Sequence, residues 1–274
     1  MIDNKARIAR LKPEEYQSIL GVKKPTFEKM LELLEAKHAE KKKRGRPEKV
    51  SILDRLVIAL DYWHDYRPMR RIAFDYDISK SLVQSYIVWV EDILIKSGEF
   101  ALPSKRVLGQ ESDIEIVIVD VTEHEIERPK KNQKKWYSGK KKKHTIKTLL
   151  FANAVENTVI AIAQAIGSTH DFKVFKENFR GWREEILCLG DSGFQGILDL
   201  HKNSKIPIKR KKKQKLSDES KRYNHELSKE RIYIEHINAW IKRFKILKYP
   251  YRNRRKRHGL RVALICGIYN FQRT

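Results

Sequence analysis

The amino-acid sequence predicts an all-helical N-terminal region followed by an α/β domain with a mixed sheet flanked by helices. Three observations support this prediction. Apolar residues recur at helical spacing in roughly the first hundred positions. The chain then changes to β-branched runs, of which the longest is DIEIVIVDVTEHE at residues 113–125. Two of the later apolar runs end on an aspartate, Asp120 and Asp191.

Residues 1–50 predict helices followed by a basic linker. Apolar side chains from Phe27 to Leu34 repeat at helical spacing. The stretch KKKRGRPEK at 41–49 then breaks the pattern with a glycine and a proline. Within it, Arg44 and Arg46 resemble the arginines of an AT-hook, which enter the narrow minor groove of A·T-rich DNA. A solvated linker is the alternative interpretation.

Residues 51–100 predict a helix-turn-helix. Helices are expected over 53–65, 68–76 and 80–97, with Ser79 as the N-cap of the third. The third helix begins with polar positions that we expect to be exposed and to bind DNA: Lys80, Ser81, Gln84 and Ser85. Such side chains suit a helix that enters a major groove. A three-helix bundle without a DNA role is the alternative, and the charge of the chain favours DNA binding.

Residues 101–274 predict the element order βββαβαβα. Strands are expected over 113–125, 143–153, 158–166, 186–190 and 206–208, and helices over 171–179, 194–203 and 218–244. The second and third strands form a hairpin whose turn contains Glu156 and Asn157. This order fits a ribonuclease-H-like domain, in which the first and fourth strands are neighbours.

Asp120, Asp191 and Glu235 are the candidate catalytic and metal-binding residues. In the proposed fold the first and fourth strands are neighbours, so the two aspartates that end apolar runs could meet. Glu235 belongs to a polar helical stripe with Arg231, Asn238 and Lys242, beside an apolar stripe. Carboxylates from different elements can hold two divalent cations about 3.5–4 Å apart against a phosphodiester. The alternatives are turn roles for the aspartates and a surface ion pair between Arg231 and Glu235.

The chain is strongly basic. Lys and Arg number 59 against 35 Asp and Glu, a net charge of +24. The excess is spread over several runs, including 129–143, 209–215 and 252–257, which indicates an extended contact surface for a polyanion. In the first run, Trp136 lies among lysines that are candidate DNA contacts: Lys134, Lys135 and Lys140. The ring could stack on an unpaired base or pin the hairpin to the core.

The cysteines and the termini indicate a cytoplasmic, nucleoid-associated protein. Cys188 and Cys266 lie in apolar surroundings and predict buried thiols in a reducing compartment. The N-terminus has no apolar signal segment, and the apolar stretch at 262–269 is too short to span a bilayer. We therefore expect no membrane partner.

With these residues in view, the chain resembles a DDE transposase of a bacterial insertion sequence, in the insertion-sequence-five family related to Harbinger transposases. The resemblance rests on IVIVDVTEHEIERPKKNQKKWYSGKKKKHTIK, GSTHDFKVF, LGDSGFQGI and ERIYIEHINAWIKRFKIL. It implies that Asp120, Asp191 and Glu235 bind two Mg²⁺ ions, with Mn²⁺ as a substitute. Arg231 and Lys242 are the implied basic partners, and Ser228 replaces the tyrosine usual in the family. Further motif positions are implied to position ligands or DNA: Thr122, Arg128, Ser138, Gly139, Lys140, His144, Lys147, His170 and Asp171.

The resemblance implies an enzyme that binds the terminal inverted repeats of its element and catalyses metal-dependent cleavage and transfer of DNA strands. The implied partners are the double-stranded DNA of the repeats, the target DNA and a second copy of the chain in a homodimer on DNA. A non-catalytic DNA-binding regulator derived from a transposase is the alternative. A structural RNA-binding protein is a third interpretation.

Overall fold

A computed structural model describes residues 3–40, 48–210 and 215–273. The chain divides into two compact units. The first comprises Met1–Ala101, Lys242–Lys248 and Leu264–Thr274, and the second comprises Leu102–Ile241 and Tyr249–Ala263. Arg44 and Arg46, the predicted AT-hook arginines, lie outside the described residues.

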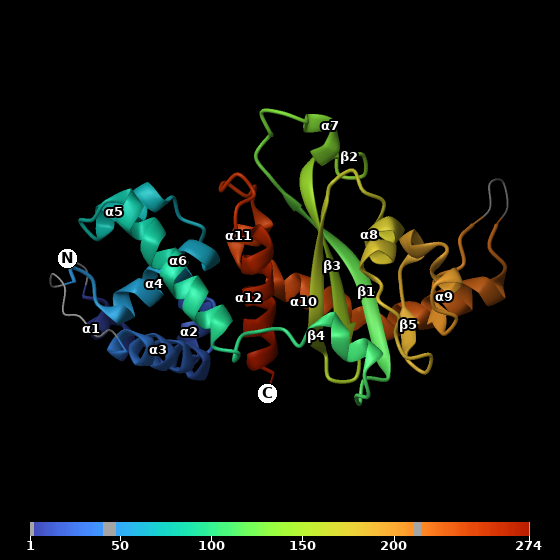
Figure 1. The fold of residues 1–274 in the computed structure, drawn as a ribbon, viewed down its shortest axis with the longest axis horizontal. Helices are drawn as coiled ribbons and strands as arrows, with labels where there is room; N and C mark the ends of the chain where they lie inside the picture. The colour runs from blue at the N-terminus through green and yellow to red at the C-terminus, as the bar shows by residue number, and fades with distance from the viewer. Residues whose placement is uncertain (1–2, 41–47, 211–214, 274) are drawn as a thin grey trace. The chain divides into compact units, whose positions relative to one another are not determined.

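The first unit is helical, as the apolar spacing predicted (Figure 1). Its helices are α1 (Asn4–Ala9), α2 (Glu15–Leu20), α3 (Lys24–Ala39), α4 (Ile52–His64), α5 (Met69–Asp75), α6 (Lys80–Lys96) and α11 (Lys245–Lys248), with the C-terminal part of α12 (His258–Phe271). The predicted N-cap is present, since the Ser79 hydroxyl accepts a hydrogen bond from the Leu82 amide at 3.2 Å. The apolar stripe of α6, which includes Val83 and Ile87, is buried and packs against α4 and α5. The helix-turn-helix prediction is thereby confirmed.

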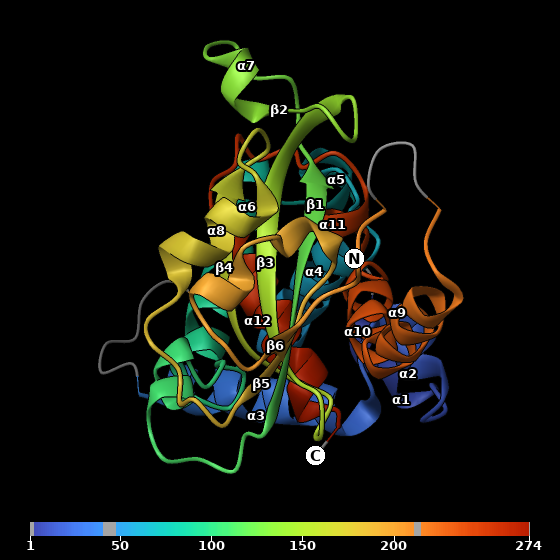
Figure 2. The same ribbon diagram turned by 90° about the vertical axis from the view of Figure 1, so that its right-hand side faces the viewer.

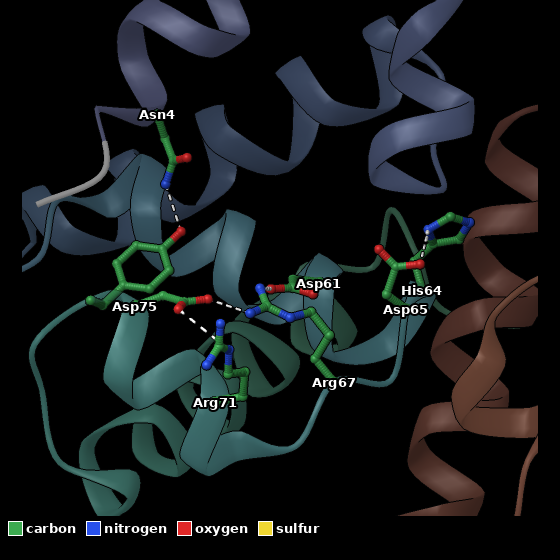
Figure 3. A network of polar contacts seen from close by, with 8 residues as sticks. Asn4, Asp61, His64, Asp65, Arg67, Arg71 and Asp75 are labelled. Atoms are coloured by element: carbon green, nitrogen blue, oxygen red, sulfur yellow. Dashed lines mark hydrogen bonds and ion pairs between the residues drawn. The ribbon is translucent and has the colours of Figure 1, made fainter.

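A polar network fixes the start of the helix-turn-helix. Figure 3 shows the Arg67 guanidinium between Asp61 of α4 and Asp75 of α5, with Arg71 on the other side of Asp75. Arg67 donates to Asp61 at 2.7 Å and also to Asp75. The hydrogen bond from Arg67 lowers the pKa of Asp75, whereas burial raises the pKa of Asp61 despite the same arginine. The network ties α5 to α4 through ionised groups.

The second unit is built on a mixed sheet. Its strands are β1 (Ile116–Glu125), β2 (Tyr137–Ser138), β3 (Lys143–Asn153), β4 (Thr158–Ile166), β5 (Leu187–Leu189) and β6 (Ser204–Lys205). They are ordered β2-β3-β1-β5-β6, and β4 also pairs with β3. The predicted hairpin of 143–153 and 158–166 is present, and Asn157 takes a left-handed φ of 56° in its turn. β1 and β5 pair in parallel, so the predicted neighbours do meet.

The two faces of the sheet receive different helices, as Figure 2 shows for α8 (Asp171–Asn178) and α10 (Ile232–Ile241). Val117 and Val119 of β1 pack in one apolar core with Phe175 of α8. β-strand alternation turns Ile118 and Asp120 to the other face, where α10 contacts β1. Strand alternation therefore carries Asp120 to the side of the sheet that α10 covers.

Three predicted elements are wrong in detail. The helix expected at 194–203 is replaced by short 3₁₀ turns, η2 (Ser192–Phe194) and η3 (Ile197–Asp199), because Gly196 between them is left-handed at φ 95°. The strand expected at 206–208 pairs earlier, at Ser204–Lys205. The single helix expected at 218–244 is divided at Arg231 into α9 (Asp218–Glu230) and α10. The remaining elements are α7 (Gln133–Trp136) and η1 (Lys105–Gly109).

Both cysteines are free and buried, as the apolar surroundings predicted. Burial raises the pKa of the Cys188 and Cys266 thiols far above the ordinary range, so both stay protonated. In the part of the chain that the structure describes, no helix combines the length and apolar character needed to cross a bilayer.

Candidate active site

The register of β1 and β5 brings two predicted carboxylates together. In this parallel pair, Ile118 lies opposite Leu189. Continued by two residues, the register would bring Asp191 beside Asp120, and the charge of Asp191 does act on the pKa of Asp120. Neighbouring strands lie about 4.8 Å apart, so the two carboxylates can share a cation. The parallel register thus joins two residues that are distant in sequence.

Asp120 is partly buried and is held by α10. The amide Nδ2 of Asn238 donates to Oδ2 of Asp120 at 2.8 Å. Burial raises the pKa of Asp120, and the nearby Asp191 charge raises it further, whereas Arg231 lowers it. When both carboxyl groups are ionised their negative charges repel each other, and a bound cation would relieve that repulsion.

A tight turn holds Asp191. Its Oδ1 accepts a hydrogen bond from the Gly193 amide at 2.7 Å, which caps the 3₁₀ turn η2. A Cβ at Gly193 would lie 2.9 Å from that same oxygen and 3.3 Å from Oδ2 of Asp171. The absence of a side chain at position 193 therefore gives both carboxylates their room.

The position of Glu235 relative to Asp120 and Asp191 is inferred from its place on α10. Arg231 and Asn238 both act on Asp120, one by charge and one by a hydrogen bond. Glu235 and Asn238 lie one turn apart on α10, whereas Arg231 precedes the first residue of that helix. The side chain of Glu235 is exposed. Among the described residues, no three or more His, Cys, Asp or Glu side chains are grouped to hold an ion, so its role as a ligand stays a prediction.

Asn238 and Arg231, which act on Asp120, each carry a buried polar atom without a protein partner, as does Thr122 two residues further along β1. Within the described ranges these atoms are Oγ1 of Thr122, Nε of Arg231 and Oδ1 of Asn238. Buried polar groups are normally hydrogen-bonded, so a cluster of exceptions marks a place where water, a cation or a substrate completes the bonding. Oxygen donors from carboxylates, a hydroxyl and an amide are the ligands that Mg²⁺ prefers. The residues present fit a magnesium site.

A second ionised cluster lies behind the Asp191 turn. Nζ of the buried Lys147 donates to Oδ1 of Asp171 at 2.6 Å and lies 4.0 Å from Oε1 of Glu123. Glu123 also accepts from the Thr145 hydroxyl at 2.8 Å. Lys147 and Asp171 were singled out in the sequence, whereas Glu123 was missed. Its signal was strand alternation, because it lies opposite Lys147 in the β1–β3 register.

The connection between β1 and β3, residues 126–142 with α7 and β2, projects beyond the ends of these two strands and is called the basic hairpin (Figure 2). Lys134, Lys135 and Lys140 are exposed, as a phosphate-binding surface requires. Trp136 is half-buried, and the Arg255 guanidinium lies 4.5 Å from its ring centroid. One partner of this ring is thus a basic residue from another part of the chain. Whether the ring also stacks on a base stays a prediction.

The remaining motif residues mostly stabilise the hairpin and its neighbours. Arg128 donates to Gln133 at 3.0 Å, Ser138 accepts from the Lys141 amide at 3.2 Å, and the rings of His144 and Tyr137 meet edge to face. His170 is the N-cap residue of α8. Lys242 lies just beyond α10, in the segment grouped with the first compact unit.

The predicted DNA-reading positions are on the surface of α6. The four side chains are exposed: Lys80, Ser81, Gln84 and Ser85. They occupy the first turns of the second helix of the motif, the part that enters a major groove in helix-turn-helix proteins. Their contact with DNA stays a prediction.

The fold and the site define a class, a helix-turn-helix region joined to a ribonuclease-H-like domain with paired carboxylates. Comparison with known proteins identifies the family. The pattern described as "DDE superfamily endonuclease" matches residues 119–270, and that described as "Helix-turn-helix of DDE superfamily endonuclease" matches residues 48–100. The chain belongs to the DDE superfamily endonucleases. The resemblance to insertion-sequence transposases is thus confirmed at the level of the superfamily.

Two curated relatives agree with this assignment. The chain is 41% identical over 264 residues to a protein of Microchaete diplosiphon described as the probable transposase for insertion sequence element IS702, covering 96% of each chain. It is 24% identical over 236 residues to a protein of Streptomyces albus G named as the candidate transposase for insertion sequence element IS112, covering 83% of each. No solved structure matches the chain significantly.

Proposed function

We propose that this protein is the transposase of an insertion sequence, which cleaves DNA at the ends of its element and joins those ends to target DNA. The observation that supports the proposal is that Asp120, on the strand parallel to β5, feels the charges of Asp191 and Arg231 and accepts a hydrogen bond from Asn238. The match over 96% of the chain, at 41% identity, to a relative described as a probable transposase supports the proposal. We assign the insertion-sequence-five family as part of the same proposal.

In the proposed reaction, Asp120 and Asp191 would hold divalent cations, with Glu235 as the third ligand from α10. When bound, Mg²⁺ would supply the Lewis acidity that activates a water or a 3′-hydroxyl and stabilises the leaving oxygen. The residues of the chain orient the ligands. Asn238 fixes the Asp120 carboxylate, and the Gly193 amide fixes that of Asp191. Arg231 lowers the pKa of Asp120 and thus favours the ionised form that binds a cation.

DNA binding is assigned to two surfaces. We propose that Lys80, Ser81, Gln84 and Ser85 of α6 read the terminal inverted repeats in the major groove. The exposed lysines Lys134, Lys135 and Lys140, with Arg231 and Lys242 on either side of α10 in the sequence, would contact phosphates without reading sequence. Because two element ends must be cut and joined, we expect a homodimer in the DNA complex.

The test is Asp191→Asn in the full chain, with DNA that carries an end of the element. Cleavage that depends on Mg²⁺ should be lost, whereas binding in the absence of metal should stay within about twofold, because the helix-turn-helix is unchanged. Exposed Glu177, which pairs with Lys173 on the surface of α8, provides the control Glu177→Gln. The assignment of Asp191 fails if the Asn variant still cleaves at the wild-type rate. Wild-type protein that binds the ends and never cleaves them would favour a non-catalytic regulator.

A further inference from the structure

A groove opens at the β6 edge of the sheet, lined by the turns that follow β5, the β6 segment and helix α9. It has a volume of about 610 Å³ and is lined by Gln195, Leu198, Ser204, Ile206, Pro207, Ile208, Lys209, Arg210 and Tyr223. Neither the catalytic carboxylates nor the hairpin surface described above includes these residues. The groove has no role in the proposed function so far.

Strand register places the groove next to the carboxylates. β5 and β6 pair in parallel with Leu189 opposite Lys205, and the Gly190 amide donates to the Lys205 carbonyl at 3.0 Å. A Cβ at Gly190 would lie 3.3 Å from Cγ2 of Ile206, a residue of the groove wall. Ile206 thus packs on the face of β5 opposite to that of residues 189 and 191, and the same register, continued by two residues, would bring Pro207 of the groove beside Asp191. In open α/β sheets, ligands bind outside the carboxyl ends of the strands, where this groove lies.

The surface of the groove is apolar and unusually exposed. Leu198 is 50% exposed, Ile208 is 45% exposed and Tyr223 is 37% exposed. Large apolar side chains that gather in one exposed groove mark a binding surface. The groove combines these side chains with two cations, Lys209 and Arg210, and none of its described lining residues is acidic.

The aromatic ring is held in place by its helix. Asn224 of α9 bonds both polar groups of the Ile208 backbone, accepting from its amide at 2.8 Å and donating to its carbonyl at 3.0 Å. The Tyr223 hydroxyl donates to the Ile206 carbonyl at 3.4 Å. The two Asn224 bonds hold α9, and with it the ring of Tyr223, along the segment that carries the two cations, as a stacking platform requires.

We propose that this groove binds unpaired DNA nucleotides next to the phosphate held at Asp120 and Asp191, with a base stacked on Tyr223 and the backbone held by Lys209 and Arg210. The proposal rests on the proposed function, because it takes those two aspartates to be the site of phosphodiester chemistry. The charge of the lining favours a polyanion over an apolar protein partner. Exposed apolar side chains beside cations match the chemistry of single strands, whose unstacked bases need an apolar surface.

The test measures binding of the full chain to two probes without divalent metal. One is a flush-ended duplex, and the other is the same duplex with a short unpaired thymidine tail. One stacked base should make wild-type protein bind the tailed probe between about fivefold and a hundredfold more tightly. Tyr223→Ala should reduce this preference to near one, and Tyr223→Phe, which keeps the ring, should retain it. Lys209→Ala with Arg210→Ala should weaken binding of the tail and reduce its salt dependence.

Arg222→Ala is the matched control, since Arg222 is the exposed neighbour of Tyr223 on α9 and is not a lining residue. It should keep the tail preference. The proposal is overturned if wild-type protein has no tail preference or if Tyr223→Ala keeps it. It is also overturned if Tyr223→Ala changes only self-association in sedimentation. Wild-type binding to the flush duplex and Mg²⁺-dependent cleavage are measured separately. Failure of the transposase assignment can therefore be distinguished from failure of the groove proposal.

Discussion

The Gly193→Ala substitution probes how closely the turn at Asp191 is matched to its carboxylate. Position 193 does not have a left-handed φ, so an alanine can adopt the backbone without strain. The added Cβ, however, would lie 2.9 Å from Oδ1 of Asp191, whereas ordinary contacts begin at 3.4 Å. The oxygen must therefore withdraw by about half an ångström, because 3.4 less 2.9 Å leaves that difference.

The magnitude follows from the tolerance of the proposed metal site. Metal ligands are held to within about 0.2 Å of their preferred distances, and a misplacement of about 1 Å costs on the order of a hundredfold in rate. A shift of about half that size predicts a loss of roughly tenfold in Mg²⁺-dependent cleavage. Stability should change by less than about 1 kcal/mol, because alanine restricts the unfolded chain and offsets part of the crowding.

The measurements are the single-turnover cleavage rate at saturating Mg²⁺, the melting temperature and DNA binding in EDTA. The last two are internal controls and should resemble those of the wild-type protein. A variant that cleaves at the wild-type rate would refute the reasoning, because the crowded oxygen would then not be a ligand whose position matters. A variant that is poorly folded would show the effect to be structural, which also contradicts the expected stability.

Three further predictions concern charge and stability. Burial, reinforced by the Asp191 charge, raises the pKa of Asp120 in the folded protein. Ionised Asp120 therefore destabilises the metal-free fold once the pH exceeds the pKa of this carboxyl in the unfolded chain. Asp120→Asn should raise the melting temperature at neutral pH in EDTA and should give no gain near pH 3. Burial, and then the Arg261 charge, lowers the pKa of His258 to about 4, so the unfolded chain binds the extra proton and unfolding free energy should fall by up to about 3 kcal/mol as pH drops from about 6.5 to 4. His258→Gln should flatten that slope in denaturant titrations, and an unchanged slope would assign it to other groups. Ser79→Ala should cost about 1 kcal/mol in denaturant unfolding, because the Leu82 amide loses its cap; no loss would show that the cap is dispensable.

Much of the architecture was predictable because its signals are local. The N-cap at Ser79 and the hairpin turn at Asn157 each depend on a few neighbouring residues. The aspartates were visible because each ends an apolar run. By contrast, the prediction of a helix at 194–203 was wrong because of one residue. Apolar spacing does not reveal that Gly196 adopts a left-handed conformation.

The partners of the candidate ligands were harder to predict, because they depend on tertiary contacts. Asn238 was visible as a member of a polar stripe, yet only packing of α10 on β1 shows that it holds Asp120. Likewise, the sequence places Trp136 among lysines and gives no sign that Arg255, more than a hundred positions later, lies over its ring. Long-range pairs of this kind carry no periodic signal.

The parallel pairing of β1 with β5 also has a consequence for how such genes can change. The hydrogen-bonded ladder, and not the chain between the strands, sets the spacing of Asp120 and Asp191. Insertions in the turn at 154–157 or in the segment between α8 and β5 would lengthen the gene product and leave the two carboxylates facing each other. A slip of one residue in the ladder would turn one aspartate to the opposite face and abolish the pair. Descendants of this gene can therefore differ in the lengths of these loops, whereas the register of the three residue pairs between β1 and β5 must be conserved.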